Sequence, residues 1–556
     1  QLPILTGSGH ILVYAFELLS KMYIEDGYTG RDAARLILEK NLSGMEIDPR
    51  AGAMASFALT MKACELDSRF LRRGVSPRIT VLNRVEFEPE ELQYVEYLRN
   101  RPELMDAAAH LDECGSLLTV SSEDLEAVAR DLASLAGEET IFGGLAAEKL
   151  KRLQVELDPL SRRYDVVVAN PPYMGSSNMN GWLSGWTKKR YKEVCKDLCT
   201  CFIKRGFSLS DDRGYEALIT SDTCMYISSF EKMRKEVIER TSIVCFIDTR
   251  GTNAHPDVFD ANAGWVLWNH PGANIKGSYF KLNHPIPEKS QRLLEALANP
   301  DCGWFYRTNA SGFEAIPGSP IAYWISRKAA NLFAGTSIAD YGFAGIGMRT
   351  GDNARFLRFW FEVGFETIGI GIESAEAQIA SYSKWIPYNK GGEFRKWYGN
   401  NEYVVNWFNN GEEIKENTKR VYPELGDDLG WKISNERYYF KPGITWTGVT
   451  SGAFHCRCYE KGFIFDSGAN GLFPFNSFDR FYLAGLLNTG MADAFLKVLN
   501  PTINCGAGTL RLVPAIINNS KRDRVAEIVH ECIDLAKDDW DAFETSWEYG
   551  HHPLVR

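Results

Sequence analysis

The sequence predicts a doubly wound α/β fold, in which a parallel sheet carries helices on both faces, followed by a second, mixed α/β domain. Two observations predict it. Short β-branched and apolar runs alternate with helical stretches up to about residue 271, and this alternation is typical of parallel sheets. From residue 272 onward, aromatic residues, glycines and short β-like runs dominate instead. We therefore expect two domains, residues 1–271 and residues 272–556.

Local patterns predict the elements in order. Residues 7–23 indicate a glycine turn that enters a helix with an apolar stripe. The rest of the first domain is expected as helix and short strand over 31–47, helix 49–63, strand 78–82, a mostly helical insertion over about 88–163, strand 165–169, helix 196–209, strand 215–220, helix 230–240, strand 243–248 and strand 264–268. In the second domain, β-like runs occupy 341–370, 382–408 and 438–475, and a helix is expected over 521–547.

The amino-acid composition favours an ordinary globular protein over a membrane protein or a protein with a uniformly basic surface. Hydrophobic residues are 45% and charged residues 24% of the 556, as in ordinary soluble globular proteins. The net charge of -10 argues against a surface that coats nucleic acid everywhere, although a local basic groove is compatible with it. No stretch is long and apolar enough to span a bilayer, so we expect no membrane partner.

Twelve cysteines occur without a C-x-x-C pair, which disfavours a zinc site and favours reduced thiols in a cytoplasmic protein. We expect no metal. The chain also lacks an initiator Met, which is compatible with a fragment or with the ordered part of something longer.

The stretch DVVVANPPY, residues 165–173, predicts a buried strand that ends in a polar amide and two prolines. Asn170 offers a carbonyl oxygen, and the ring of Pro171 fixes the direction of a second one. Two acceptors aimed at one point suit an exocyclic –NH2, whose lone pair is freed when both hydrogens are held. Tyr173 offers a flat face on which a planar base can stack. The alternative to an amine-binding site is a purely structural one, in which the two prolines simply end the strand in a turn.

Two further features suit a nucleotide-like cofactor. The turn Gly7-Ser8-Gly9 before a helix lets backbone N–H groups approach a ligand closely, although such a turn is weak evidence alone. Glu46 ends the second strand, where an acid of a doubly wound fold accepts hydrogen bonds from ribose hydroxyls. The alternative for Glu46 is a solvated carboxylate. The order of turn, acid and DVVVANPPY is more specific than any one part.

On these residues the sequence resembles the Asn-Pro-Pro-Tyr class of S-adenosylmethionine-dependent adenine-N6 DNA methyltransferases. It is more closely similar to the large adenine methyltransferases of bacteriophage-exclusion (BREX) systems, relatives of the type IIG restriction-methylation enzymes. The similarity covers nearly the whole chain. The segments that carry the closer match are GSGHILVYAFELL (7–19), GYTGRDAARLILEKNLSGMEID (27–48), SSFEKMRK (228–235), GMRTGDNARFLRFW (347–360) and WIPYNKGGEFRKWYGN (385–400).

The resemblance implies a class I methyltransferase sheet (Rossmann-like), with S-adenosylmethionine as cofactor. It implies these roles: donor binding for Gly7, Ser8, Gly9, His10 and Glu46, with Asn83 as the candidate near the adenine of the donor, and catalysis for Asn170, Pro171, Pro172 and Tyr173. Two departures stand out. The family has an Asp-Pro-x-Cys or Asp-Pro-x-Ala stretch before the glycines, where this chain has Pro3 in place of the Asp. The second departure follows the third strand, where VLNRVEF leaves Asn83 as the best candidate for the acid near the adenine of the donor. The family also has a helical region upstream of the glycine turn that this sequence lacks.

The second domain is, by the same resemblance, the target-recognition domain. Two polar, basic segments around residues 349–358 and 384–397 suit contacts with phosphates and base edges. The candidate DNA-binding residues are Arg349, Asn353, Arg358, Lys390, Arg395 and Lys396. The alternative is an aromatic core with a solvated, charged rim.

The sequence therefore predicts a site-specific DNA adenine-N6 methyltransferase of a bacterial anti-phage system. Its partner is double-stranded DNA, and other defence proteins or phage-encoded inhibitors are further candidates. No metal is needed, because the sulfonium of the donor is already a good leaving group. Two alternatives remain. One is a protein glutamine-N5 methyltransferase, against which the large second domain argues. The other is a DNA-recognition subunit that has lost methylation, which Pro3 keeps open.

Overall fold

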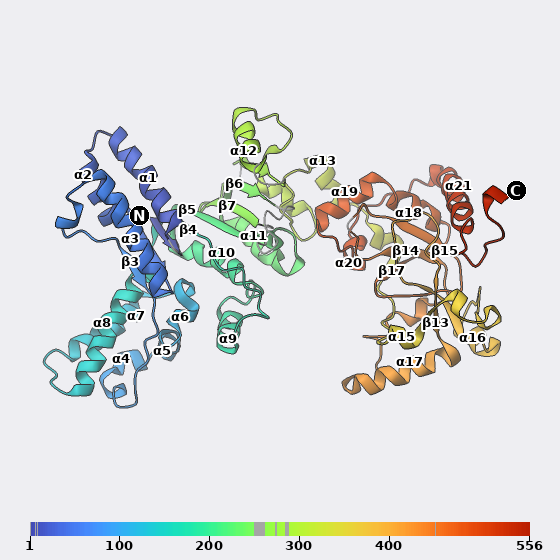
Figure 1. The fold of residues 1–556 in the computed structure, drawn as a ribbon, viewed down its shortest axis with the longest axis horizontal. Helices are drawn as coiled ribbons and strands as arrows, with labels where there is room; N and C mark the ends of the chain where they lie inside the picture. Colours follow the sequence, from blue (N-terminus) through green and yellow to red (C-terminus); the bar gives the residue numbers. More distant parts are fainter. Residues whose placement is uncertain are drawn as a thin grey trace. The chain divides into compact units, whose positions relative to one another are not determined.

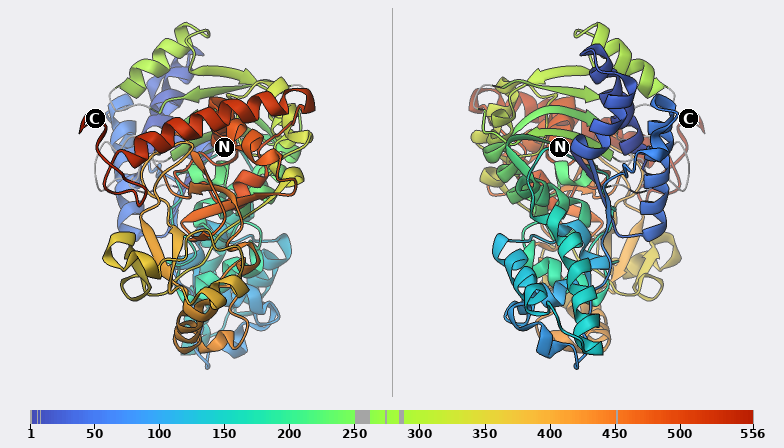
Figure 2. Two further views of the ribbon diagram at one scale, coloured as in Figure 1. Left: turned by 90° about the vertical axis from the view of Figure 1, so that its right-hand side faces the viewer. Right: turned by 90° about the vertical axis from the view of Figure 1, so that its left-hand side faces the viewer.

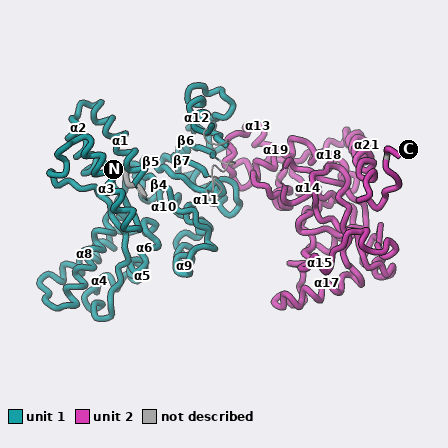
Figure 3. Tube along the Cα trace, in the orientation of Figure 1, with its two compact units in different colours: residues 1–312 teal, residues 313–556 magenta. Residues whose placement is uncertain are grey.

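The computed structural model describes residues 2–5, 7, 9–249, 262–272, 275–283, 288–450 and 452–555. It forms two compact units, residues 1–312 and residues 313–556 (Figure 3). The boundary expected at 271/272 falls inside unit 1, because strands β8 (Gly277–Lys281) and β9 (Phe305–Thr308) extend the sheet of that unit.

A nine-stranded mixed sheet is the centre of unit 1, with the order β3-β2-β1-β4-β5-β7-β6-β8-β9. Figure 1 labels β3 to β7 of this sheet. The remaining strands are β1 (Leu2–Leu5), β2 (Leu42–Glu46), β3 (Ile79–Val81), β4 (Tyr164–Ala169), β5 (Ser210–Ser221), β6 (Ser242–Asp248) and β7 (Asn262–Trp268). Strands β1 to β5 are parallel to their neighbours in this set. Because β1 pairs with both β2 and β4, the glycine turn follows a strand of the sheet.

The expectation of a wholly parallel sheet was wrong for its second half. Strand β7 runs antiparallel to both β5 and β6, and β9 runs antiparallel to β8. A parallel return to the same sheet needs a long crossover, usually a helix, whereas successive strands that pair directly are antiparallel. Strands β6 and β7 follow each other in the chain and lie side by side. The result is a sheet that is parallel around β1 and β4 and mixed beyond β5.

Several helices of unit 1 begin at a side-chain cap. Helix α3 starts at Pro49, and the side chain of Asp48 accepts the N–H of Arg50. Leu12 and Phe16 of α1 are buried in one core cluster with Leu59 of α3. The helices outside the insertion are α1 (His10–Glu25), α2 (Gly30–Leu36), α3 (Pro49–Leu66), α9 (Gly181–Arg190), α10 (Leu198–Leu209), α11 (Glu231–Arg240) and α12 (Glu288–Ala298).

The predicted insertion is mostly helical, and its helices appear in blue to cyan in the right-hand view of Figure 2. Helix α7 opens with a capping box in which Ser121 and Asp124 bind each other's backbone N–H groups. The insertion contains α4 (Glu96–Arg99), α5 (Pro102–Ala108), α6 (Leu111–Cys114), the short 3-10 turn η4 (Gly115–Leu117), α7 (Ser122–Ser134) and α8 (Ile141–Ser161).

Unit 2 has two four-stranded sheets. The first has the order β10 (Gly342–Gly345), β17 (Ala469–Pro474), β14 (Gly443–Thr447) and β15 (Cys456–Tyr459). The second has the order β11 (Leu357–Phe359), β13 (Tyr403–Asn406), β12 (Trp385–Asn389) and β16 (Ile464–Phe465). The sequence placed β-like runs in the segments that contain these strands.

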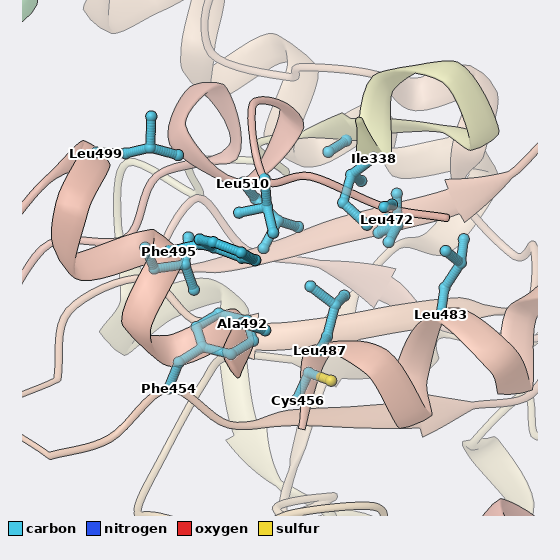
Figure 4. Close-up of a cluster of buried hydrophobic side chains, with 14 of the residues drawn as sticks. Ile338, Phe454, Cys456, Leu472, Leu483, Leu487, Ala492, Phe495, Leu499 and Leu510 are labelled. Atoms are coloured by element: carbon cyan, nitrogen blue, oxygen red, sulfur yellow. The ribbon is translucent and has the colours of Figure 1, made fainter. Parts of the chain in front are cut away.

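Helices pack on the first sheet of unit 2. Leu483 and Leu487 share a core cluster with Phe495, Cys456 and Leu472 (Figure 4). The helices are α13 (Arg327–Ala330), α14 (Ile338–Tyr341), α15 (Asn353–Phe356), α16 (Ala375–Ser381), α17 (Phe408–Val421), α18 (Asp479–Leu487), α19 (Gly490–Leu499), α20 (Ala507–Arg511) and α21 (Arg522–Asp541). The predicted C-terminal helix is α21, the long red helix in the left-hand view of Figure 2.

Candidate functional site

A cavity of about 330 Å³ lies at the carboxyl ends of β1, β2 and β4 in unit 1. We call it the central cavity. It brings together three features that are far apart in the sequence: the glycine turn, the acid after β2 and the prolines after β4. Its lining residues are Gly7, Met45, Glu46, Ile47, Leu82, Glu113, Cys114, Gly115, Ser116, Leu117, Asn170, Pro171, Pro172, Leu198 and Phe202.

The glycine turn places backbone at the edge of the central cavity. Gly7 lines the cavity, and Ser8 lies outside the described residues. Gly9 adopts φ 91° and precedes α1. A Cβ at Gly9 would lie 2.8 Å from the Cα of Ala55, so only glycine allows α1 and α3 to approach this closely. His10 is the exposed first residue of α1 and is not among the residues that line the cavity.

Glu46 is held in place by the backbone that follows β2. Its Oε1 atom accepts the N–H of Ile47 at 2.9 Å and the N–H of Asp48 at 3.1 Å. These hydrogen bonds fix the carboxylate at the wall of the central cavity instead of leaving it to sample solvent. Glu46 is the last residue of β2, and its role in binding a donor stays a prediction.

Asn83 has partners that hold it away from the central cavity. Its backbone N–H and its side-chain amide both donate to the carboxylate of Glu156, at 3.1 and 3.4 Å. The amide also donates to the carbonyl of Val81. The residue that lines the cavity after β3 is Leu82. Burial raises the pKa of Glu156, and the hydrogen bonds from Asn83 oppose that rise.

The Asn-Pro-Pro-Tyr stretch follows β4 directly. Pro171 is buried, whereas Asn170 is exposed to the central cavity. Tyr173 is 39% exposed, and its hydroxyl donates a hydrogen bond to Oδ1 of Asn170 at 3.1 Å. Burial raises the pKa of Tyr173 to about 12, so the phenol is neutral at neutral pH and keeps the proton that it donates. The amide oxygen of Asn170 is thus exposed and has one partner that can be exchanged.

One wall of the central cavity was missed in the sequence. It consists of Glu113 to Leu117, which belong to α6 and η4 in the insertion. Gly115 adopts φ 50°, and a Cβ there would lie 2.9 Å from Cγ2 of Ile47. Glu113 accepts a hydrogen bond from Nδ2 of Asn180 at 2.6 Å. In the sequence, the local feature that marks this wall is a glycine, Gly115, after a short helix. That glycine does not indicate that the segment packs against Ile47, which follows β2.

In unit 2, Arg349 and Asn353 are exposed, as a contact with DNA requires. The guanidinium of Arg349 lies 6.0 Å from the ring centroid of Trp431. The hydroxyl of Thr350 donates to Oδ1 of Asn353 at 2.5 Å. Arg358 is partly buried and donates to two backbone carbonyls at 2.6 and 2.7 Å.

The other three basic candidates have partners within unit 2. Lys390 forms an ion pair with Asp466 at 3.4 Å. Arg395 forms an ion pair with Asp539 at 2.9 Å and lies over the ring of Trp540. Lys396 donates to the carbonyl of Asn488 at 2.8 Å. The contacts of Arg395 and Lys396 connect the predicted DNA-binding loop to α21 and to Asn488, the residue after α18. Such internal partners are what the alternative interpretation, an aromatic core with a charged rim, expects.

Two classes of feature are absent from the described part of the chain. Its residues contain no group of three or more His, Cys, Asp or Glu side chains arranged to hold a metal ion. None of its helices combines the length and the apolar character needed to cross a membrane. All twelve cysteines belong to the described residues and are free thiols.

Comparisons with known proteins agree with the resemblance in the sequence. Residues 40–255 match the model of the Eco57I restriction-modification methylase family. The chain is 32% identical to the adenine-specific methyltransferase PglX of Lacticaseibacillus casei (strain Zhang), over 99% of this chain and 46% of the relative. It is 32% identical, with the same two shares, to the adenine-specific methyltransferase BrxX of Escherichia coli O9:H4 (strain HS).

A solved structure shares the fold. The type IIL restriction-modification enzyme MmeI, in complex with DNA, superimposes with a TM-score of 0.54 at 10% identity, over 99% of this chain and 66% of that chain. The chain spans somewhat less than half the length of the two curated relatives, 46% in each case. Over nearly its whole length the chain is therefore similar to the PglX and BrxX proteins and corresponds to one part of them.

Proposed function

We propose that the chain transfers a methyl group from S-adenosylmethionine to N6 of a specific adenine in DNA, within a bacterial anti-phage system of the BREX type. One observation carries the proposal: Gly7, Glu46 and the Asn170-Pro171-Pro172 stretch line one cavity. The relatives named as adenine-specific methyltransferases support the same reaction.

The sheet supports a doubly wound, Rossmann-like donor-binding fold of class I methyltransferase type. Strands β3-β2-β1-β4-β5 are parallel, and their order reverses between β1 and β4. In open α/β sheets, ligands bind outside the carboxyl ends of the strands at this switch point. The central cavity lies there, and its walls come from the residues that follow β1, β2 and β4.

The residues fit an adenosine-bearing donor. The central cavity of about 330 Å³ lies within the range of small-molecule sites. Gly7 presents backbone without a side chain, and Glu46 presents a carboxylate fixed by two backbone N–H groups. Such a carboxylate is suited to accept hydrogen bonds from two ribose hydroxyls. When bound, S-adenosylmethionine supplies an electrophilic methyl group on a positively charged sulfur.

Asn170 and Pro171 act on the other reactant. The target adenine must leave the base stack before its amine can reach a cavity of this kind. The Oδ1 atom of Asn170 and the carbonyl of Pro171 accept the two N–H bonds of that amine, which frees its lone pair. Because the hydroxyl of Tyr173 donates to the same Oδ1 atom, the amine replaces the phenol there. Tyr173 is then available to stack on the base with its ring.

Unit 2 supplies recognition of the target site in this proposal. The exposed Arg349 and Asn353 suit contacts with base edges or phosphates, while Lys390, Arg395 and Lys396 are held by partners of their own unit. A cytoplasmic location and association with other defence proteins or phage-encoded inhibitors belong to the same proposal. The free cysteines are compatible with that location.

The test is a transfer assay with labelled S-adenosylmethionine and three acceptors: duplex DNA of random sequence, the same DNA premethylated at adenine N6, and a mixture of proteins. We expect label in the unmodified DNA, recovered as N6-methyladenine in one asymmetric motif. Label in glutamine of a protein would replace this function with protein methylation. Donor-independent binding of DNA without transfer would reduce the chain to a recognition module.

A further inference from the structure

A second cavity of unit 1, about 360 Å³ in volume, is lined by cations. We call it the basic cavity. It lies among α9, α10 and α11 and the start of β4, elements labelled in Figure 1. Its described lining contains five positively charged side chains and no carboxylate: Arg163, Arg190, Lys204, Arg205 and Arg240, together with Thr119, Tyr191, Phe207 and Ser208. The proposed methyl transfer uses none of these residues.

Arg205 is the strongest indication that the basic cavity binds an anion, because its charge is buried and has no counter-charge among the described residues. The residue is 2% exposed. Its guanidinium donates to the carbonyls of Ser116 and Leu160 at 2.8 Å and to the hydroxyl of Ser208 at 2.7 Å. All three acceptors are neutral, and Arg205 forms no ion pair within the described chain. A buried charge is costly unless a counter-charge compensates it.

The four other cations lie at the rim and pair with carboxylates that do not line the cavity. Arg163 pairs with Asp212, whose side chain is 96% exposed, and Arg190 pairs with the exposed Glu103. Lys204 and Arg240 share Glu236, at 3.3 and 3.0 Å. The Arg163–Asp212 pair is exposed and contributes little, so Arg163 can turn to an anion inside the cavity at small cost. In the other pairs at least one side chain is partly buried, and an anion would share these cations with their carboxylates.

We propose that the basic cavity binds a phosphate oxyanion carried by a small molecule. Arginine forks match the geometry of phosphate oxygens, and here guanidinium groups line both the floor and the rim. A bound oxyanion would supply the counter-charge that Arg205 lacks. The floor is accessible only to a small ligand, because Arg205 is almost fully buried and a duplex backbone could reach no deeper than the rim.

The basic cavity shares a wall with the central cavity. Arg205 donates to the carbonyl of Ser116, and the hydroxyl of Tyr191 donates to the carbonyl of Leu117 at 2.6 Å. Ser116 and Leu117 belong to η4, and both line the central cavity from the other side. An anion that reorients Arg205 therefore acts on a wall of the donor site. This consequence, unlike the binding itself, rests on the proposed function.

Calorimetry of the full chain with inorganic phosphate and with ADP tests the binding at low ionic strength. The rim variants are Arg240→Ala and Lys204→Gln. The matched control is Arg130→Ala, because Arg130 pairs with Glu126 four residues earlier, as Arg240 pairs with Glu236, and both arginines lie over an aromatic ring. We expect binding to wild type, a loss of about two- to fivefold in each rim variant and no change in the control.

Arg205→Lys keeps the charge of the floor but removes the fork, and we expect a larger loss, about tenfold or more. If this variant does not fold, the rim variants still decide the question. Tighter binding of ADP than of phosphate identifies a nucleotide as the source of the oxyanion, and equal affinities identify free phosphate. The proposal is overturned if neither ligand binds at millimolar concentration, if the rim variants bind as wild type does, or if only a duplex oligonucleotide responds to the rim substitutions.

Discussion

Asn170→Ala separates chemistry from folding, because the structure gives the Asn170 side chain little to do in the fold. The residue is exposed, and among the described residues its side-chain amide has one hydrogen bond, from the hydroxyl of Tyr173 at 3.1 Å. Loss of one exposed hydrogen bond costs about 0.5–1.5 kcal/mol of unfolding free energy at most. We expect a correspondingly small change in thermal stability.

The expected effect on methyl transfer is much larger. Removing one preorganised polar group that acts on the reacting atoms typically costs 10²–10³ in kcat, or about 2.7–4 kcal/mol of barrier. Asn170→Ala should therefore lose about that much turnover while its affinity for the donor stays within about twofold of wild type. Single-turnover transfer to duplex DNA measures the first quantity, and calorimetry with S-adenosylmethionine measures the second.

Tyr173→Phe is the matched control, since it removes the same hydrogen bond from the other side and keeps the ring. We expect turnover equal to wild type or a few times higher, because the phenol no longer competes with the amine for Asn170. Near-wild-type turnover in Asn170→Ala would refute the assignment of this stretch as the site of transfer. A parallel loss of donor affinity and thermal stability in that variant would show that Asn170 supports the fold instead.

Four further variants test other residues of the two units. Glu46→Ala should weaken donor binding by about 1–3 kcal/mol, since hydrogen bonds to a fixed carboxylate are lost, and unchanged affinity by calorimetry would make Glu46 a surface acid. Arg349→Ala should lower the slope of log affinity for duplex DNA against log salt by about one unit. The double variant Arg395→Ala/Lys396→Ala should lower it by less than two, because both side chains have partners within unit 2; a full loss of two units would show that they contact phosphates. Burial raises the pKa of Glu216, whose carboxylate oxygens have no hydrogen-bond partner in the described chain. Because the folded state holds this proton and the unfolded state releases it above a pKa of about 4.3, Glu216 lowers stability as the pH rises from about 4. Glu216→Gln should raise the free energy of unfolding at pH 7, and denaturant titrations should show the gain shrinking toward pH 4.

The sequence by itself determined the local elements and the ends of the strands that form the central cavity. Strand β4 forms from a β-branched run that stops before Asn170, and helix α3 starts at Pro49 with Asp48 as its cap. Both elements depend on neighbouring residues, so the local sequence predicts them. The carboxyl ends of parallel strands meet at one edge of a sheet, which is why a glycine turn, Glu46 and Asn170 converge although they lie far apart in the chain.

Tertiary structure decided what depends on distant partners. The direction of β7 follows from pairing with β5 and β6, and the extension of the sheet by β8 and β9 moved the boundary of unit 1 to residue 312. No local pattern shows that Asn83 meets Glu156, 73 residues later, or that Arg395 meets Asp539, 144 residues later.

The same reason explains the wall of the central cavity and the buried charge of Arg205. Gly115 and Ile47 approach each other only because the insertion folds back onto β2, and Arg205 meets Ser116 across 89 residues. Hydrophobic periodicity records which face of an element is buried, but it does not record which side chains share that interior. The sequence therefore shows the residue types of the site. Only the tertiary structure shows which residues each of them contacts and whether a buried charge has a counter-charge.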